Sequence, residues 1–261
     1  MNKQAEGNLI SEKADDALIG LKHSLDFGAL FFREVFSGGF EFREFVYQCY
    51  RIGNKSLLLI SLTGFVLGVV FTKQSRPSLE EFGATSWLPS LVAIAVIRAL
   101  APLVTSLISA GRVGSSIGAE LGSMKVSEQI DAMEVSGVNP VKFLVVTRVL
   151  ATTVTIPLLS FYCALMAMVG AFLNVTVNEQ TNLNSFIEDA FSSIIFLDIW
   201  TGIIKAICYG FTIGIVGCYK GYHATKGTEG VGRAANSAVV TSMFLIFIEE
   251  VFLVQVTNWF R

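Results

Sequence analysis

Four charged side chains lie inside long apolar segments of this chain, where a charge is costly unless something compensates it. Arg98 and Lys205 are each the single charge of their segment, and Glu249 and Glu250 lie together in the last segment. Each cation must face a cavity, a partner carboxylate or a lipid phosphate. We interpret both cations as ligands of an anionic head group. The alternative is neutralisation by Glu249, by Glu250 or by carbonyl groups at helix ends.

Other kinds of chemistry lack their usual sequence patterns. The chain has no HExxH metal pattern and no GxxxxGK[ST] loop, so we do not expect it to bind ATP phosphates itself. Its two histidines, His23 and His223, lie outside the apolar segments. The four cysteines are scattered without a CxxC pair, which favours packing roles over a metal or disulfide role. We expect no catalytic residue, no metal site and no cofactor in this chain.

Small residues recur at helical spacing in two places. Gly114, Gly118 and Gly122 lie four residues apart, and a second row follows Gly202, Ala206, Gly210 and Gly214. Small side chains at this spacing let the backbones of two membrane helices approach closely. The rows therefore predict either ordinary packing within the chain or a contact that slides or joins two copies.

A short acidic helix is predicted at about residues 126–137, between two apolar segments. Ser127 is a suitable N-cap, and acids at 128, 131 and 134 lie three residues apart on an exposed face. Ile130 and Met133 give the helix an apolar edge, Gly137 can end it, and Pro140 prevents its continuation. Such a helix is either simply solvated or a docking element for a partner outside the membrane.

The elements that position these residues are membrane helices. Of the 261 residues, 52% are hydrophobic and only 15% are charged, with a mean hydropathy of +0.61. Soluble domains carry about 25% charged residues, and a membrane span needs about 20 mostly apolar residues. Five segments meet this requirement, at about 56–72, 87–110, 143–175, 199–219 and 238–259. The chain is predicted to be an all-α integral membrane protein.

The N-terminal region is more polar than the rest. Residues 1–39 predict a tail followed by a helix that breaks at Ser37-Gly38-Gly39. Residues 40–54 predict an amphipathic helix too short to span, with Phe42, Phe45, Val46 and Cys49 on one face. We expect this helix to lie flat on the membrane, and packing against a soluble core is the alternative. Residues 55–261 then form the five-span domain.

The distribution of Lys and Arg predicts the orientation. Fourteen of these residues fall on the side of the N-terminus and the acidic helix, against three on the other side. Cytoplasmic loops carry the excess of such residues, so we expect the N-terminus inside and the C-terminus outside. The acidic 176–198 loop is also outside, and its 186–197 part is apolar enough to lie on the membrane or re-enter it.

One stretch resembles the central signature of a known family. Residues 107–140 read LISAGRVGSSIGAELGSMKVSEQIDAMEVSGVNP, which is similar to the signature of MlaE/YrbE-type permeases. The resemblance extends to IRALAP at 97–102, TRVLATTVTIPLL at 147–159 and GVGRAANSAVV at 230–240. It covers roughly residue 40 to the C-terminus. It implies an amphipathic elbow helix followed by five transmembrane helices, in agreement with the pattern of the residues.

The resemblance also implies a function. Permeases of this family are the dimeric membrane subunits of ABC transporters that move phospholipids between the two membranes of diderm bacteria, and lie in the inner membrane. ATP and magnesium are then bound by a separate ABC ATPase. The other implied partners are a periplasmic MCE-domain protein and a small STAS-domain protein that binds the ATPase, and no nucleic acid is expected. The acidic segment would be the coupling helix, with contacts to the ATPase from Glu128, Gln129, Asp131, Met133 and Glu134.

Two cations match basic family positions near the lipid cavity. The resemblance implies lipid contacts from Arg98, Lys205 and Glu250, and the apolar side chains Phe65 and Val69 would line the cavity. One position departs from the family, because Ala99 stands where a glutamate is common. That change removes a local partner for Arg98.

Two other classes of protein are weighed against this interpretation. An ion-driven secondary transporter of a lipophilic substrate is expected to show inverted repeats around a midplane acid, and neither is evident. An intramembrane enzyme needs a catalytic constellation, which is also not evident. Stimulation of an ATPase in a co-purified complex separates the ABC permease from both.

Overall fold

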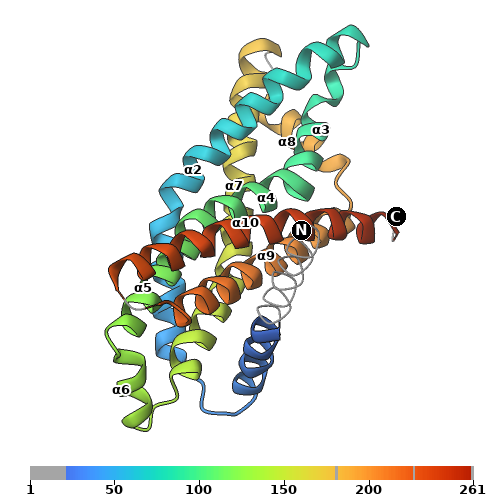
Figure 1. Cartoon of the computed structure of the whole chain (residues 1–261). Coiled ribbons are helices and arrows are strands. Elements are labelled where there is room, and N and C mark those ends of the chain that lie inside the picture. The colour runs from blue at the N-terminus through green and yellow to red at the C-terminus, as the bar shows by residue number, and fades with distance from the viewer. Residues whose placement is uncertain (1–21, 180–181, 226, 260–261) are drawn as a thin grey trace, which may run out of the picture.

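The computed structural model describes residues 22–179, 182–225 and 227–259, and its elements are helical throughout (Figure 1). The predicted polar tail at residues 1–16 lies outside the described residues. A first helix covers residues 22–35. The helices that follow are α2 (Phe42–Glu81), η1 (Thr85–Trp87), α3 (Leu88–Ala95), η2 (Val96–Leu100), α4 (Ala101–Ser109), η3 (Ala110–Gly114), α5 (Ser115–Val126), α6 (Gln129–Val135), η4 (Val141–Val146), α7 (Thr147–Glu179), α8 (Leu183–Ser192), α9 (Phe196–Tyr222) and α10 (Thr228–Trp259).

Five helical segments are long and apolar enough to cross a membrane, which confirms the predicted all-α membrane architecture. Span one is α2, span two runs from η1 to α5, span three joins η4 to α7, and spans four and five are α9 and α10. Spans one, two and three have 40, 42 and 37 residues. Because about 20 residues suffice to cross, these three helices extend well beyond the apolar layer.

The predicted separate helix at residues 40–54 is not confirmed. Residues 42–54 form the first turns of α2, which continues without interruption to Glu81. Gln48, Ile52, Ser56 and Ile60 are buried on one face of these turns, and the same face continues into the span. Of the apolar face that we assigned to the membrane surface, Phe42 and Val46 are exposed, whereas Phe45 and Cys49 pack partly against the core. The chain breaks earlier, at Gly38 and Gly39, whose φ angles of 73° and 72° lie in the left-handed region.

The helix at residues 22–35 is the element that packs beside the spans. Its Phe27 ring lies 5.5 Å from that of Tyr219, and its Phe31 ring lies 5.7 Å from that of Phe211. Both contacts are with α9. The amide of Asn139 also donates a hydrogen bond of 2.9 Å to Glu34. The N-terminal helix is thus attached to span four and to the loop that follows α6.

The most extensive helix contact joins α2 to α7. Glycines make it possible, because a Cβ on Gly68 would overlap the carbonyl group of Ala167, and one on Gly170 would overlap that of Phe65. A Cβ on Gly64 would lie 2.7 Å from the carbonyl oxygen of Cys163. Membrane helices have little hydrophobic force between them and associate through close packing. The small residues of this contact therefore hold spans one and three together.

Span two contains two π-helical turns, η2 and η3. Pro102 explains the first, since it cannot donate to the carbonyl of residue 98 and its ring crowds that carbonyl. Arg98 lies in η2 and Arg112 lies in η3. Turns of this kind widen the helix locally and are frequent at functional sites. Both arginines of the span thus lie where its helix is irregular.

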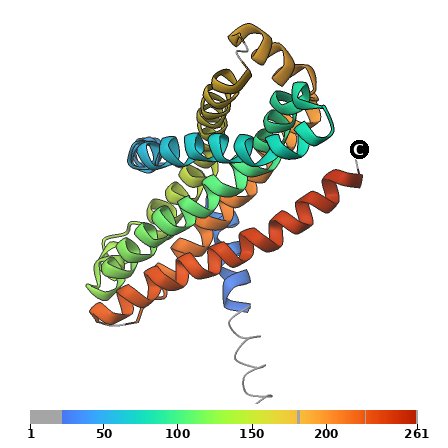
Figure 2. The ribbon, with the colours of Figure 1, turned by 90° about the horizontal axis from the view of Figure 1, so that it is seen from above.

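The two ends of the molecule carry different short helices, with α6 at one end and α8 at the other (Figure 1). The 186–197 segment is not one continuous helix, because α8 ends at Ser192 and α9 begins at Phe196, and its place on or in the membrane stays a prediction. α8 packs on α3, with Phe186 only 3% exposed and the Ser90 hydroxyl donating to the Asp189 carbonyl at 2.6 Å. Figure 2 shows α10 on the outer side of the molecule. Only 17% of the 18-residue apolar stretch of α10 is buried.

The α2–α7 contact predicts a sharp difference between two glycines. Gly68→Ala places a methyl group into the backbone of α7, and we expect a loss of roughly 1–3 kcal/mol of stability. Gly28→Ala is the matched control, because nothing lies within 4 Å of a Cβ there. The measurement is the thermal midpoint of the purified protein in detergent. Equal midpoints for the two variants would contradict the glycine contact.

Candidate functional site

Helix α6 presents an acidic surface at its end of the molecule. Glu128, Asp131 and Glu134 are exposed, while Ile130 is fully buried and Met133 packs partly against the same core. The helix has seven residues, from Gln129 to Val135. One face of this short element is therefore anchored in the bundle and the other is available to a partner. The ATPase contacts assigned to its residues stay a prediction.

The start of α6 differs from the prediction, whereas its end agrees with it. Ser127 is not its N-cap, because the Ser127 hydroxyl donates back to the carbonyl of Ser123 at 2.7 Å and so closes the end of α5. The α6 helix starts after Glu128, whose φ of 60° turns the chain sharply. Gly137 ends α6 as predicted, with a φ of 79°. The amide of Val138 donates to the carbonyl of Met133 at 3.0 Å, which completes a left-handed stop.

Two acids of α6 also bind neighbouring side chains. Lys125 Nζ lies 2.6 Å from Asp131 Oδ1, and the Tyr222 hydroxyl donates to Glu134 Oε1 at 3.3 Å. No hydrogen bond or ion pair of the Glu128 or Gln129 side chains is found among the described residues. α6 is thus tied to α5 and α9, and its first residues are left for other contacts.

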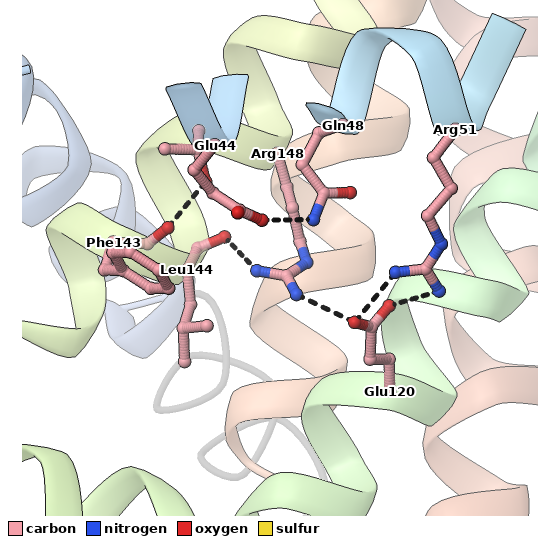
Figure 3. Close-up of polar contacts among 8 residues, drawn as sticks. Glu44, Gln48, Arg51, Glu120, Phe143, Leu144 and Arg148 are labelled. Carbon is pink, nitrogen blue, oxygen red and sulfur yellow. Dashed lines mark hydrogen bonds and ion pairs between the residues drawn. The ribbon is translucent and has the colours of Figure 1, made fainter. Parts of the chain in front are cut away.

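A partly buried ion cluster joins α5 to two other spans (Figure 3). Glu120 of α5 receives two hydrogen bonds from Arg51 of α2, at 2.9 and 2.8 Å. The same carboxylate accepts a third from Arg148 of α7 at 3.0 Å, and Arg148 also donates to the Leu144 carbonyl at 2.9 Å. Arg148 is 3% exposed. We call Glu120, Arg51 and Arg148 the Glu120 cluster.

Sequence reasoning missed the Glu120 cluster. We counted Arg148 and Arg112 among the loop cations that orient the chain, but both lie inside helices of the spans. Glu120 stands in the quoted family signature without an assigned role. The available signal was a single acid in a stretch of small residues, together with a cation at the start of an apolar run. An ion pair between them cannot be read from their separation of 28 residues.

The glycine rows serve packing within the chain. A Cβ on Gly118 would lie 3.2 Å from Ala235 Cα and 3.2 Å from Ala238 Cβ, so α5 lies close against α10 there. Gly114 and Gly122 face residues of α9 and α10 and of the segment between them, at 3.3 Å or more. In the second row, a Cβ on Gly202 would lie 2.6 Å from the Ile97 carbonyl oxygen, and one on Gly210 would lie 2.7 Å from that of Thr152. The alternative of a contact between two copies is not needed to explain either row.

Polar side chains form a stripe along α9. Asp198, Lys205, Tyr209 and Thr212 recur at spacings of seven, four and three residues, which places them on one helix face. All four are buried. Their partners come from span two and from α10, as the next two contacts show.

Lys205 is neutralised within the chain. Its Nζ donates to Glu250 Oε1 at 2.7 Å, and the Tyr209 hydroxyl donates to the other carboxylate oxygen of Glu250. Lys205 is 2% exposed. Next to it, Thr212 donates to Glu249. The geometry favours the alternative that we weighed for Lys205, a partner carboxylate. Its side chain also lines an apolar pocket between α9 and α10, and its lipid contact stays a prediction.

Arg98 lies at the other end of the stripe and is more accessible. Its guanidinium donates to Asn258 Oδ1 at 3.2 Å and lies 3.9 Å from Asp198 Oδ1, with the side chain 20% exposed. We had placed Asp198 in the outer loop, but it is buried in the first turn of α9. A partner from another helix therefore replaces the local glutamate that Ala99 removes. Contact of Arg98 with lipid stays a prediction.

The predicted apolar lining divides between two surfaces. Phe65 and Val69 are half-buried on α2, where they adjoin Gly170 of α7. On α10, Phe244, Phe247, Val251 and Phe252 are each more than half exposed, and other spans also expose apolar side chains, such as Leu58 of α2. The lipid-contact role of Phe65 and Val69 is not tested by this geometry.

The letters GSSIG at residues 114–118 match the GxSxG pattern of a nucleophile elbow, which requires a sharp strand-to-helix turn. Here the segment is a continuous helix that passes from η3 into α5. η3 and α5 therefore do not form a nucleophile elbow.

Comparison with known proteins points in one direction. A family model described as Permease MlaE matches residues 45–256. A probable ABC transporter permease protein of Rickettsia typhi is 37% identical over 208 residues, which cover 80% of each chain. A probable ABC transporter permease protein of Synechocystis is 32% identical over 222 residues, covering 85% of this chain and 84% of that one. The chloroplastic protein Trigalactosyldiacylglycerol 1 of Arabidopsis thaliana is 33% identical over 216 residues, covering 83% of this chain and 62% of the plant protein.

The Glu120 cluster predicts an order of stability. Glu120→Gln leaves two guanidinium groups, one of them buried, without a carboxylate, and we expect a loss of about 3–5 kcal/mol. Arg51→Gln keeps the pair between Glu120 and Arg148 and removes a partly exposed cation. We therefore expect a loss of about 1 kcal/mol of stability. Glu80→Gln, at the far end of α2, is the control. Thermal and denaturant midpoints in detergent measure all three, and equal losses for the first two would contradict the shared carboxylate.

The Lys205–Glu250 pair predicts recovery in a double variant. Lys205→Met alone leaves Glu250 without its cation, at a cost of about 3–5 kcal/mol. Adding Glu250→Met removes both charges and should restore most of that stability. Thermal midpoints and the phospholipid that co-purifies are measured together. A double variant that regains stability but has lost the lipid would show that Lys205 or Glu250 contacts lipid in addition to pairing with the other.

Proposed function

Since the chain belongs to the MlaE permease family, we propose that it is the membrane subunit of an ABC transporter that moves phospholipids between the inner and outer membranes. The chain is a multi-pass transporter permease subunit. Its proposed partners are a separate ABC ATPase, which binds ATP and magnesium, an MCE-domain protein that receives or delivers lipid, and a STAS-domain protein bound to the ATPase. In this proposal two copies of the chain form the transporter core in a bacterial inner membrane.

The observation that carries this proposal is the position of α6. An exposed acidic helix, anchored by the buried Ile130, connects spans two and three at one end of the molecule. Acid side chains on a short, fixed helix suit a cleft on a soluble partner that carries complementary charge. We assign the coupling role to Glu128, Gln129, Asp131, Met133 and Glu134. The α6 end is then cytoplasmic, and the C-terminus of α10 is periplasmic.

The Glu120 cluster gives a physical route from α6 into the membrane. A force on α6 reaches α5 directly, and Glu120 connects α5 to α2 and α7 through hydrogen bonds of 2.8–3.0 Å. Breaking these bonds strands buried charge, so the helices move as one body instead. ATP-driven closure of two ATPase subunits would thus move spans one, two and three together.

Two features support a lipid as the cargo. Span five exposes a continuous apolar surface that includes Phe244, Phe247 and Phe252, which suits acyl chains in a cavity between two copies. The name of the plant relative is that of a glycolipid. Within such a cavity we propose Arg98 as a contact for the head group, because it keeps an exposed edge. The further lipid contacts proposed from the sequence are Lys205, Glu250, Phe65 and Val69.

The proposal predicts that α6 can be uncoupled without unfolding the permease. Glu128→Lys combined with Glu134→Lys reverses the exposed charge, and we expect ATPase stimulation and lipid transfer to fall about tenfold or more in the reconstituted complex, which corresponds to at least 1.4 kcal/mol of lost docking energy. The measurements are ATP hydrolysis and transfer of fluorescent phospholipid in proteoliposomes.

The matched control is Glu80→Lys combined with Glu81→Lys, which makes the same charge change at the opposite end of α2. This control should retain activity and ATPase binding. Normal transport by the α6 variant would contradict the coupling assignment. An equal loss in both variants would show a general effect of charge and contradict it as well.

A further inference from the structure

A polar pocket lies between α2 and span two, beside the Glu120 cluster. It has a volume of about 250 Å³. The polar or charged side chains that line it are Gln48, Arg51, Lys55, Ser56, Arg112, Ser116 and Glu120. The Glu120 cluster forms one wall, and Lys55, one turn further along α2, is exposed beside it. The pocket is at the α6 end of the molecule and has no part in the Arg98 and Lys205 contacts.

The charges around this pocket do not balance. Arg51, Lys55 and Arg112 line it with Glu120 as the only acid, and Glu120 also serves Arg148 behind the wall. Four cations therefore lie at or behind the pocket wall with one carboxylate, and a further acid nearby is Glu44, which accepts a hydrogen bond from Gln48. The side chains of Lys55 and Arg112 form no hydrogen bond or ion pair in the part of the chain that the structure describes. Unpaired cations at the edge of a bilayer call for an anionic ligand.

Ser56 is one of five buried hydroxyl residues without a hydrogen-bond partner among the described residues, and it is the one of the five that lines this pocket. This residue is 1% exposed. Buried hydroxyl groups are nearly always satisfied, and one that lacks a protein partner suits a site for a bound acceptor. A hydroxyl donor beside lysine and arginine matches a phosphate group, which only accepts hydrogen bonds when fully ionised.

An apolar groove begins on the other side of Arg112. It is lined by Leu59 of α2, by Leu107 and Ile108 of span two, and by Met243 of α10, and Arg112 lies on both the groove and the pocket. The polar pocket and the apolar groove therefore share one guanidinium. A free anion would use only the pocket, whereas a molecule with a phosphate and an acyl chain would occupy both.

We propose that this pocket binds the phosphate group of a membrane phospholipid, with Lys55, Arg112 and Ser56 as its donors and an acyl chain along the groove. The site rests on the proposed lipid transport and adds to it a binding position on the α6 side of the bilayer. Arg112 and Arg98 are fourteen residues apart on span two, or about 20 Å along a helix. The two arginines thus serve opposite ends of the membrane region. Inorganic phosphate shares the head-group chemistry and is the other source that a test must separate.

The test is native mass spectrometry of the full chain, delipidated in a neutral detergent. The protein is titrated with short-chain phosphatidylglycerol, with diacylglycerol of the same chain length, and with inorganic phosphate. Lys55→Gln combined with Arg112→Gln should weaken binding of the phospholipid about tenfold or more, because two charge-assisted contacts are lost. Its binding of diacylglycerol should not change. Lys73→Gln combined with Arg233→Gln removes two exposed cations elsewhere and should bind as the wild type does.

Ser56→Ala keeps the test decisive if the double variant folds poorly. Removing an unsatisfied buried hydroxyl should leave the thermal midpoint unchanged or raise it, while phospholipid binding falls several-fold. Unchanged phospholipid binding in both pocket variants would overturn the proposal. Inorganic phosphate that binds as tightly as the phospholipid, and is lost in the same variants, would show a free-anion site and overturn the lipid assignment.

These outcomes are separate from failure of the proposed function. If the wild type binds phosphatidylglycerol and the complex transports it, but the pocket variants bind it normally, only the pocket proposal is wrong. If the wild type binds no phospholipid in this titration and the complex with its ATPase transfers none, the lipid-transport proposal itself is wrong.

Discussion

One carboxylate constrains how this protein can move. Glu120 holds a guanidinium from α2 and another from α7, and the second is almost wholly buried. Separation of α5 from either helix would leave a charge without a counterion in a poorly solvated place, which costs several kcal/mol. Spans one, two and three are therefore linked at the end that carries α6. A partner bound to α6 would therefore act on three linked helices rather than on a flexible loop.

The remaining helices are connected by a different set of contacts. Glycine rows let α5 approach α10 and let α9 approach span two and α7, while the polar stripe of α9 pairs with Arg98 and with Glu250 of α10. Close packing and interhelical hydrogen bonds are the forces available to helices in lipid. Lys205 shows why a lone charge in a sequence is ambiguous. Its charge is compensated by the carboxylate of Glu250, 45 positions away. This structural role explains the lysine without a lipid ligand.

Properties that depend on local composition were predictable from the sequence. Hydropathy found five spans, and the glycine at 137 marked the end of α6, because both signals are contained in a few consecutive residues. Properties that depend on a distant partner were not. The turns at 42–54 bury Gln48 and Ile52 against distant parts of the chain and leave Phe42 and Val46 exposed, and the local pattern does not show where the helix continues. Ser127 had two suitable uses and the structure takes the other, at the end of α5. Asp198 could not be assigned to Arg98 before α9 was known to begin at Phe196.

Span two connects these observations. It carries Arg98 and Arg112 on its two π turns, Glu120 in its last straight section, and α6 directly after it. A π turn adds a residue to the helix without adding a hydrogen bond, so a span keeps two of them only where irregular geometry is useful. Here each turn carries one arginine, and the two lie about 20 Å apart along the span. In the proposed transporter, the ATPase acts on span two through α6. The same span carries both arginines that we propose as phosphate ligands. Motion of α6 along the axis of span two would move both arginines, and this places coupling and cargo recognition on a single element.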